Sequence, residues 1–406
     1  VEVNKVANAL STMGVVSGQS VALLMMNSAD MVAAFFACAK LGVVVVPVNW
    51  RLTVDELAFI VADAEATVLM YGPEFTGLVG DVRGRSDVVV NHYVQTGSAP
   101  TEPVPEWARE LRPLVAGAPA IEIELNNAAE DLLFIMYTSG TTGHPKGVMH
   151  SHLGVLWAMV TLDASSDTHL GDRYLVSLPM FHLGALMPVI AASYAGATLV
   201  VQRSFDPVRT WELIGAERIT SGLLVPTMLQ MMWAARPPHE PTISSLRWMM
   251  CGAAPVPVPL IEAYAELGVQ IHQAYGLTET AGPLCLVGPD AALARIGSTG
   301  RPTFHTEVRV VDTDGNDVGA GGTGEIISRS PHTMLGYWKR PAETAEAIVD
   351  GWLHTGDVAE LDADGYLYLR DRIKDMIISG GENVYPAEIE EVLLRHPGIR
   401  DAAVIG

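Results

Sequence analysis

Residues 21–49 read VALLMMNSADMVAAFFACAKLGVVVVPVN, and this stretch decides the fold class. Val21–Met25 is an apolar run of strand length, and the valine-rich end of the stretch is another. Between them, Ala29–Leu41 has the length and composition of a helix, with Asn27 or Ser28 as its N-terminal cap. Strand, helix and strand in this order predict two neighbouring parallel strands of a buried sheet.

The same alternation continues along the chain. Thr53 and Glu56 form a capping box that opens a second helix, and Thr67–Tyr71 is the next strand. A stretch rich in proline and glutamate, residues 97–110, is typical of a surface excursion. The strand–helix pattern then resumes and continues over residues 131–287. A doubly wound α/β arrangement with mixed sheets is therefore expected.

The pattern changes after Ser298, where short alternating strands are separated by Asp-Gly or glycine-rich turns. We predict a large N-terminal domain over residues 1–371, with a β-rich subdomain at about 298–371. Residues 372–406 would begin a small α+β C-terminal lobe that is truncated within this sequence. The fold class is thus α/β, with two unequal domains.

Composition excludes several function classes. The 406 residues include 46 acidic and 25 basic side chains, a formal net charge of −21, which disfavours nucleic-acid and anionic-membrane partners. The three cysteines lie far apart, form no metal or disulfide pattern, and suit a reducing, cytoplasmic location. Residues 174–202 carry no formal charge but are interrupted by proline and glycine, so they predict a buried helix and strand rather than a transmembrane segment.

Residues 137–150, YTSGTTGHPKGVMH, follow an apolar run and suit an anion. Glycines allow backbone N–H groups to approach an anion closely, hydroxyls add neutral donors, and Lys146 adds one charge. The stretch does not match a Walker A loop. Pro145 stands where that motif requires its second glycine, and Gly147 stands where it requires a serine or threonine. A GxGxxG pattern at 319–324 joins two predicted strands, which indicates a hairpin loop. From the residues alone, 137–150 is either an anion-binding loop or a flexible surface turn.

YTSGTTGHPKGV resembles the signature of the adenylate-forming (AMP-binding) superfamily, which includes the acyl-CoA synthetases. Further motifs follow in that family's order, and the resemblance covers essentially the whole chain. It is strongest to bacterial fatty-acyl-CoA synthetases of the mycobacterial long-chain type and to feruloyl-CoA synthetases. The further motifs are PMFHLGAL (179–186), VPTM (225–228), CGAAPVP (251–257), QAYGLTET (273–280), GEI (324–326), GYW (336–338), WLHTGD (352–357) and DRIKDMIISGGENVYPAEIE (371–390).

The resemblance implies a reaction in two halves. A carboxylate attacks the α-phosphate of ATP to give an acyl-adenylate and pyrophosphate, and coenzyme A then displaces AMP. ATP, Mg²⁺ and coenzyme A are the expected cofactors and co-substrates, with a small-molecule carboxylic acid as the partner. The assembly is left open, with a homodimer as one alternative.

Residue roles follow from the same resemblance. The loop would hold the β- and γ-phosphates, Thr278 would donate to the α-phosphate, and Glu279 would hold Mg²⁺. Tyr275 would stack on adenine, with a core aromatic as the alternative. The loop residues are Thr138, Ser139, Gly140, Thr141, Thr142, Gly143 and Lys146. The strip beneath the nucleotide is Gly252, Ala253 and Ala254, and further nucleotide contacts are expected from Gln273, Ala274 and Gly276.

Asp357 would accept both ribose hydroxyls, with a turn residue as the alternative, and Arg372 would add a ribose or phosphate contact. Lys374 would be the hinge about which the small lobe turns between the two half-reactions. Gly380, Gly381 and Glu382 would then line the pantetheine channel. The family's C-terminal lysine, in a Pro-x-x-x-x-Gly-Lys motif, is expected after Pro386 and does not occur in these residues.

His182 borders the acyl site in this resemblance and would orient the carboxylate, with a packed histidine as the alternative. FHLGAL (181–186) carries no acid to pair with a substrate ammonium, which disfavours an amino-acid substrate. The expected acyl lining is apolar or small, and each buried CH₂ favours binding by ~0.8 kcal/mol, so a medium- or long-chain fatty acid is expected. An aryl acid, an acyl-AMP ligase and an inactive nucleotide-binding homologue remain the alternatives.

Overall fold

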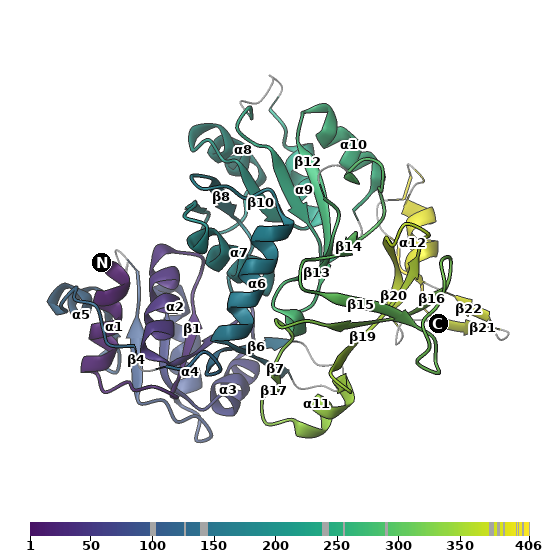
Figure 1. Ribbon diagram of the computed structural model, residues 1–406. Coiled ribbons are helices and arrows are strands. Elements are labelled where there is room, and N and C mark those ends of the chain that lie inside the picture. The colour runs from purple at the N-terminus through teal and green to yellow at the C-terminus, as the bar shows by residue number, and fades with distance from the viewer. Residues whose placement is uncertain are drawn as a thin grey trace.

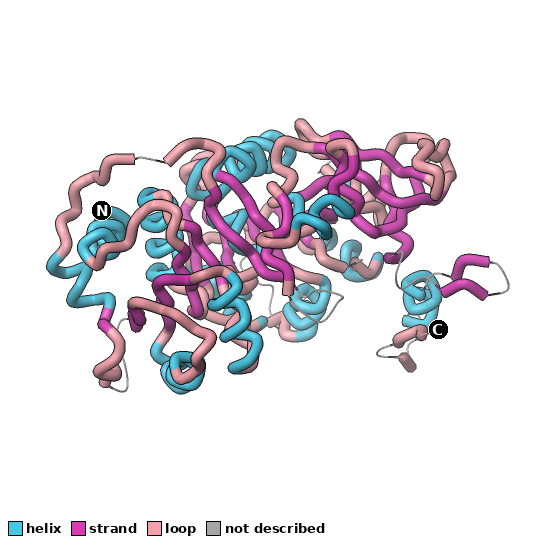
Figure 2. Tube along the Cα trace, turned by 90° about the horizontal axis from the view of Figure 1, so that it is seen from below, coloured by secondary structure: helices cyan, strands magenta, loops and turns pink. Residues whose placement is uncertain are grey.

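The structure is a computed structural model of the chain. It describes residues 1–97, 103–125, 127–138, 145–237, 243–254, 256–288, 291–372, 377–379, 382–384, 386–394, 396, 398–399 and 402–405. The N- and C-termini lie at opposite ends of the molecule in both views (Figures 1 and 2). No described helix is both long and apolar enough to cross a bilayer.

The first sheet has eight strands in the order β17-β7-β6-β2-β1-β3-β4-β5. Its central strands pair in parallel, whereas β7 and β17 are antiparallel, so the sheet is mixed as predicted. The strands are β1 (Ser20–Leu24), β2 (Val44–Pro47), β3 (Ala66–Tyr71), β4 (His92–Gln95), β5 (Arg109–Glu110), β6 (Leu132–Thr138), β7 (Lys146–Ser151) and β17 (Gly336–Tyr337). The helices of this part are α1 (Glu2–Thr12), α2 (Ala29–Leu41), α3 (Val54–Asp63), α4 (Thr76–Arg83) and α5 (Leu111–Gly117).

Local signals explain why these elements form. Ser28 rather than Asn27 caps α2, because its side chain accepts a hydrogen bond from the Met31 N–H. The capping box of Thr53 and Glu56 is present at the start of α3. The excursion at 97–110 is only partly a surface feature, since Trp107 stacks on the buried Tyr71 with ring centroids 6.0 Å apart.

The second sheet has seven strands in the order β14-β13-β12-β11-β10-β8-β9. Its strands are β8 (Arg173–Val176), β9 (Thr198–Val201), β10 (Ser221–Leu224), β11 (Trp248–Cys251), β12 (Gln270–Gly276), β13 (Pro283–Leu286) and β14 (Arg301–Pro302). The helices are α6 (His152–Ser165), α7 (Leu183–Tyr194), α8 (Pro207–Ala216), α9 (Pro226–Ala234) and α10 (Val258–Glu266), with a single turn of 3₁₀ helix, η2 (Thr278–Thr280). The uncharged stretch 174–202 forms two parallel strands around α7, one strand more than predicted.

One buried core joins the two sheets. It includes side chains of β1 and β2, of α2, α6 and α7, and of β8 and β11. Figure 1 shows α6 and α7 between the first sheet and the second. The ends of β6, β7 and β12 are thereby held at fixed positions relative to one another, and these ends carry the predicted site.

The residues of the predicted β-rich subdomain form a third sheet in the order β15-β16-β19-β18, with β20 paired to β19. Its elements are β15 (Glu307–Val311), β16 (Thr323–Arg329), α11 (Pro341–Ala347), β18 (Ile348–Val349), β19 (Trp352–Leu361) and β20 (Leu367–Arg372). The GxGxxG at 319–324 connects the antiparallel β15 and β16, as predicted. Figure 2 shows β21 (Ile377–Ser379), β22 (Glu382–Val384) and α12 (Pro386–Leu394) projecting at the C-terminal end.

Candidate active site

The predicted phosphate loop connects the two strands of a β-hairpin. β6 and β7 pair antiparallel, and their register brings Thr138 opposite Lys146, so the two ends of the loop are adjacent. A Cβ on Gly147 would lie 2.6 Å from Cγ2 of Ile135 and 3.1 Å from the ring of Tyr137, so only glycine fits this turn-proximal position. The residues predicted between the strands lie outside the described residues: Ser139, Gly140, Thr141, Thr142 and Gly143.

Tyr337 contacts both Lys146 and Glu279. The ammonium Nζ of Lys146 lies 5.0 Å from the centroid of the Tyr337 ring, within cation–π range. The Tyr337 hydroxyl donates a 2.8 Å hydrogen bond to Oε1 of Glu279. Burial, and then the neighbouring Glu279 carboxylate, raise the pKa of Tyr337 above its usual range, so the phenol stays a donor.

The turn that carries Thr278 and Glu279 is held through its carbonyl groups. Nε2 of His150 lies 2.7 Å from the Thr278 carbonyl oxygen, and Nδ1 of His332 lies 2.5 Å from that of Thr280. Between them, the Met334 N–H donates to the Glu279 carbonyl at 2.7 Å. Three successive carbonyls therefore accept hydrogen bonds from β7 and from the segment before β17. This fixes the backbone from which both predicted ligand side chains project.

Both histidines act as neutral donors. A carbonyl oxygen can only accept, so His150 carries its proton on Nε2 and His332 on Nδ1. His150 is 1% exposed and His332 is fully buried. Burial lowers the pKa of His150 to about 4 and also lowers the pKa of His332. Nδ1 of His150 has no hydrogen-bond partner among the described residues, as expected for a bare nitrogen against the Phe134 ring.

His150 makes stability depend on pH. Because its pKa is about 4 in the folded state against an ordinary value of 6.5 for a solvated histidine, the unfolded chain binds a proton more readily between these values. Lowering the pH from 7 to 5 is expected to remove about 2 kcal/mol of unfolding free energy through His150 alone. His150→Gln, which keeps a donor but cannot titrate, is expected to lose that much less over the same interval.

The measurement is denaturant unfolding of both proteins at pH 7 and pH 5. His396→Gln, a change at an exposed histidine, is the matched control and is expected to follow the parent protein. An identical loss in the parent and in His150→Gln would contradict the assignment of a neutral, buried His150.

The predicted nucleotide strip lies where β11 and β12 end side by side. The register pairs Cys251 with Gln273, so Gly252 lies beside Ala274. A Cβ on Gly252 would lie 2.7 Å from the Ala274 carbonyl oxygen, and glycine permits this close approach. Ala253 has φ +70°, a left-handed conformation uncommon for alanine. Ala253 and Ala254 are exposed, as a surface that receives a planar ring requires.

At the end of β12, Tyr275 is bound to Asp357 of β19. The Tyr275 hydroxyl donates to Oδ2 of Asp357 at 2.7 Å, and Nε of Arg372 lies 3.3 Å from Oδ1. Tyr275 and Asp357 are each 7% exposed over the whole residue, while the side chain of Arg372 is largely exposed. The Tyr275 ring packs against the core of the β-rich subdomain. Burial and Asp357 raise its pKa, so it remains a donor to the carboxylate. Its stacking on adenine stays a prediction.

His182 lies apart from these groups, at the N-terminus of α7. Its ring centroid is 4.4 Å from that of Phe181, which in turn lies 5.9 Å from Trp50. Neighbouring protein atoms, and then the Arg51 guanidinium, lower the pKa of His182 although its side chain is exposed. The imidazole is therefore neutral near pH 7. An aromatic group with a neutral histidine at its edge suits the mouth of an apolar site.

Of the predicted C-terminal residues, Lys374, Gly380 and Gly381 lie outside the described residues. Glu382 begins β22 and pairs with Ser379 across the two-stranded sheet. The hinge and the pantetheine contacts therefore stay predictions.

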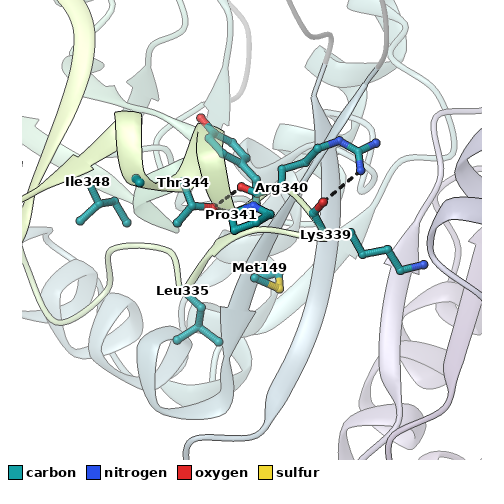
Figure 3. A pocket seen from close by; sticks show the side chains of 9 residues that line it. Met149, Leu335, Lys339, Arg340, Pro341, Thr344 and Ile348 are labelled. Atoms are coloured by element: carbon teal, nitrogen blue, oxygen red, sulfur yellow. Dashed lines mark hydrogen bonds between the residues drawn. The ribbon is translucent and has the colours of Figure 1, made fainter.

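A surface cavity of about 580 Å³ adjoins the site, and Tyr337 of β17 is among its lining residues. Its lining includes Met149, Leu335 and Ile348, together with the basic Lys339 and Arg340 (Figure 3). Both basic side chains already have partners, because Lys339 pairs with Glu65 and Arg340 with Asp63. The cavity therefore carries no uncompensated charge from these two residues.

The residues present fit a magnesium ion shared with a nucleotide. In the described part of the chain, no three His, Cys, Asp or Glu side chains are grouped as a protein-only metal site. Mg²⁺ bound to a triphosphate needs only one or two carboxylates, because phosphate oxygens and water complete its shell. Glu279 has one oxygen, Oε1, hydrogen-bonded to Tyr337, and no hydrogen bond to Oε2 occurs among the described residues.

The sequence alone does not indicate that Tyr337, His150 and His332 hold the turn at 278–280 in place. Tyr337 lies within the quoted GYW motif, so its position was visible but its contact was not. His150 is buried in β7, opposite Phe134 in the register, and the apolar alternation of that strand was the available signal. His332 lies in a loop, and nothing in its local sequence indicates a contact with Thr280.

The chain is similar to a known enzyme family and to curated CoA ligases. A family model described as AMP-binding enzyme matches residues 1–338. The chain is 41% identical to the long-chain-fatty-acid–CoA ligase FadD13 of Mycobacterium tuberculosis, over 99% of this chain and 78% of that protein. It is 39% identical to a feruloyl-CoA synthase of an Amycolatopsis species, over 100% of this chain and 78% of that protein.

Solved structures of CoA synthetases have the same fold as this chain. A fatty acyl CoA synthetase of Mycobacterium tuberculosis superposes with a TM-score of 0.87 at 39% identity, covering 100% of this chain and 78% of that chain. The o-succinylbenzoate coenzyme A synthetase of Bacillus subtilis, in complex with ATP and a magnesium ion, gives 0.87 at 31% identity, covering 100% and 80%. The predicted fold class is confirmed by these structures.

Proposed function

The chain belongs to the AMP-binding enzyme family, and on that premise we propose that it activates a hydrophobic carboxylic acid with ATP and transfers the acyl group to coenzyme A. The two curated relatives described above form CoA thioesters of a fatty acid and of ferulate. ATP, Mg²⁺ and coenzyme A are accordingly the cofactors and co-substrates. The observation that carries the proposal is the grouping of Lys146, Tyr337 and Glu279, together with the Tyr275–Asp357 pair, whose tyrosine precedes Glu279 by four residues.

In the first half-reaction, a carboxylate oxygen of the acid forms a bond to the α-phosphorus while the bond to pyrophosphate breaks. Lys146 and the loop that it follows would neutralise the charge that develops on the leaving group. Glu279 would hold the magnesium ion, which neutralises phosphate charge when it is bound. Thr278 would donate to the α-phosphate. Asp357 and Arg372 would fix the ribose end, so that the α-phosphate stays aligned.

In the second half-reaction, the thiol of coenzyme A loses its proton and its sulfur bonds to the acyl carbon. The bond between that carbon and the phosphate oxygen of AMP breaks, and AMP leaves. The thiol must reach the carbonyl from a new direction. A turn of the C-terminal lobe about Lys374 would bring Gly380, Gly381 and Glu382 to the site and line the pantetheine channel. The proposed boundary near residue 371 coincides with the last residues of β20, and a strand end suits a hinge.

The acid is proposed to be a medium- or long-chain fatty acid. Helix α7, which follows His182, buries only apolar side chains among its described residues, including Ala185, Leu186 and Ile190. Ala274 belongs to the expected acyl lining as well as to the nucleotide contacts, and it is small and only partly buried. A long apolar substrate suits such a lining, because binding strengthens by ~0.8 kcal/mol for each buried CH₂.

A second candidate substrate is an aryl acid. The rings of Trp50, Phe181 and His182 contact one another at the N-terminus of α7 and offer edges and faces to an aromatic ring. Feruloyl-CoA and indoleacetate–CoA ligases are among the relatives, at 39% identity in both cases.

The test is a pyrophosphate-release screen of the full-length protein with ATP, Mg²⁺ and coenzyme A. The panel contains short, medium and long saturated fatty acids, cinnamic and ferulic acids, and an amino acid. The highest kcat/KM is expected for a medium or long fatty acid. A preference for cinnamic or ferulic acid would select the aryl alternative, and release with none of the acids would contradict a CoA ligase.

Ala274→Trp is expected to move the preference toward shorter acids. The indole would occupy several CH₂ positions of the expected acyl path, each worth about fourfold in affinity. The measurement is kcat/KM across the fatty-acid series, for which an unchanged length preference would contradict the pocket assignment. Gly282 also belongs to the expected acyl lining, but a Cβ there would already contact the buried Ala158 and Leu162 of α6 at 3.8 Å, so a larger indole is expected to disturb the core packing.

A further inference from the structure

Tyr337 separates the two charged side chains of the site. Its ring face carries the Lys146 ammonium at 5.0 Å from the centroid, and its hydroxyl donates to Oε1 of Glu279 at 2.8 Å. Among the described residues, no ion pair joins Lys146 to Glu279 or to any other acid. A single neutral side chain therefore contacts the cation expected at the leaving group and the carboxylate expected at the metal.

The position of Tyr337 is set by the protein backbone. Tyr337 pairs with Val148 and Gly336 with Met149, so β17 extends the edge of the first sheet next to the strand that carries Lys146. The Trp338 N–H donates to the Gly147 carbonyl at 2.7 Å, and the Tyr337 N–H donates to Oγ1 of Thr344 at 2.9 Å. The ring cannot shift along the strand without breaking these bonds. Its place does not depend on a bound nucleotide.

The Glu279 side is fixed in the same way. The Glu279 carbonyl accepts from the Met334 N–H, three residues before Tyr337, while the Glu279 carboxylate accepts from the Tyr337 hydroxyl. One short segment thus holds both the backbone and the side chain of Glu279. A tyrosine that only filled space at the edge of the neighbouring cavity would not need this hydroxyl contact.

A neutral partner suits both charges better than a direct ion pair would. A Lys–Glu pair would have to break before the lysine could contact phosphate and the carboxylate could contact metal. A phenol that binds one carboxylate oxygen leaves the other oxygen available to an ion. A cation over a ring face is held by a weak attraction that a phosphate can replace.

We propose that Tyr337 is a positioning residue for adenylation, whose hydroxyl orients Glu279 toward magnesium and whose ring holds Lys146 toward the leaving pyrophosphate. The inference rests on the proposed function, because it assigns Tyr337 a role in that same half-reaction. It predicts that the two contacts can be removed one at a time, with different kinetic results.

The experiment is ATP–pyrophosphate exchange by the full-length protein, measured against Mg²⁺ at fixed ATP and against ATP at saturating Mg²⁺. Tyr337→Phe keeps the ring and removes the hydroxyl. It is expected to raise the Mg²⁺ concentration for half-maximal exchange about tenfold, as for other groups that orient metal ligands, with KM for ATP within about twofold of the parent value. Tyr337→Leu also removes the ring and is expected to raise KM for ATP about fivefold in addition.

Tyr264→Phe is the matched control. It removes a buried hydroxyl that donates to the Leu229 carbonyl at 3.0 Å, outside the site, so it is expected to lower the melting temperature without changing either kinetic parameter. If Tyr337→Phe lowers only the melting temperature, or changes KM for ATP and the Mg²⁺ requirement equally, the positioning role is wrong. If the parent protein catalyses no exchange with any acid, the proposed function fails instead, and the two failures are thereby distinguished.

Discussion

Replacing Glu279 with glutamine is expected to slow acyl-adenylate formation by about 10³-fold, the upper range for loss of one group that stabilises transition-state charge. Glutamine keeps the size of the side chain and an oxygen that can accept from the Tyr337 hydroxyl at the 2.8 Å position, so the local fold is retained. What is lost is the negative charge expected to hold the magnesium ion. The measurement is pyrophosphate exchange over a wide range of Mg²⁺ concentration.

Higher Mg²⁺ is expected to restore part of the activity of Glu279→Gln, since the ion still binds the phosphates of ATP. Glu307→Gln is the control, because Glu307 is exposed and pairs only with Arg329 among the described residues. It should behave as the parent protein does. Wild-type exchange by Glu279→Gln at low Mg²⁺ would remove Glu279 from the metal site.

Asp357→Ala is expected to raise KM for ATP by about 10²-fold and to destabilise the protein at the same time. The kinetic effect follows from loss of the carboxylate expected to accept the ribose hydroxyls, two charge-assisted bonds of about 1.5 kcal/mol each. The stability effect follows from Tyr275, a buried residue whose hydroxyl donates to Asp357. Leaving this buried donor without a partner costs about 1–3 kcal/mol of unfolding free energy.

Two further variants separate these effects. Tyr275→Phe removes the donor but keeps the Asp357 carboxylate, so KM for ATP should change by much less than in Asp357→Ala. Asp364→Ala changes an aspartate that is 57% exposed and is expected to leave both quantities unchanged. A normal KM for ATP in Asp357→Ala would show that Asp357 is a structural turn residue rather than a ribose ligand.

The fold was accessible from sequence wherever local signals and hydrophobic pattern agreed. The strand–helix–strand unit of residues 20–47, the capping box at Thr53 and the hairpin around 319–324 all formed as predicted. Each of these depends on residues close together in the chain. The extra strand β8, at the start of the uncharged stretch, was missed because a short apolar strand and a buried helix look alike in periodicity.

The candidate site was only partly accessible. Motif resemblance located the ends of β6, β7 and β12, because glycine and hydroxyl residues there are local features of the sequence. It could not supply the contacts of Tyr337, His150 and His332, since each contact joins segments far apart in the chain. Such contacts depend on how the two sheets meet across the shared core, and no local pattern encodes that geometry.

The groups that hold the backbone of the turn at 278–280 differ from those expected to contact the nucleotide. Buried neutral groups, namely two histidines and one backbone amide, hold the carbonyls of the turn at 278–280. The side chains of Thr278 and Glu279 are thereby left to meet the nucleotide. Preorganised donors and ligands of this kind lower the cost of reorganisation during the reaction.

The central claim is that one site first joins an acid to AMP and then passes the acyl group to a thiol. It is tested most directly by incubating the full-length protein with ATP labelled at the α-phosphate, Mg²⁺ and a long-chain fatty acid, and following the label before and after coenzyme A is added. The account predicts enzyme-bound acyl-AMP with an equivalent of pyrophosphate at first, and free AMP with acyl-CoA only after the addition. Formation of ADP, or release of AMP without dependence on coenzyme A, would contradict it.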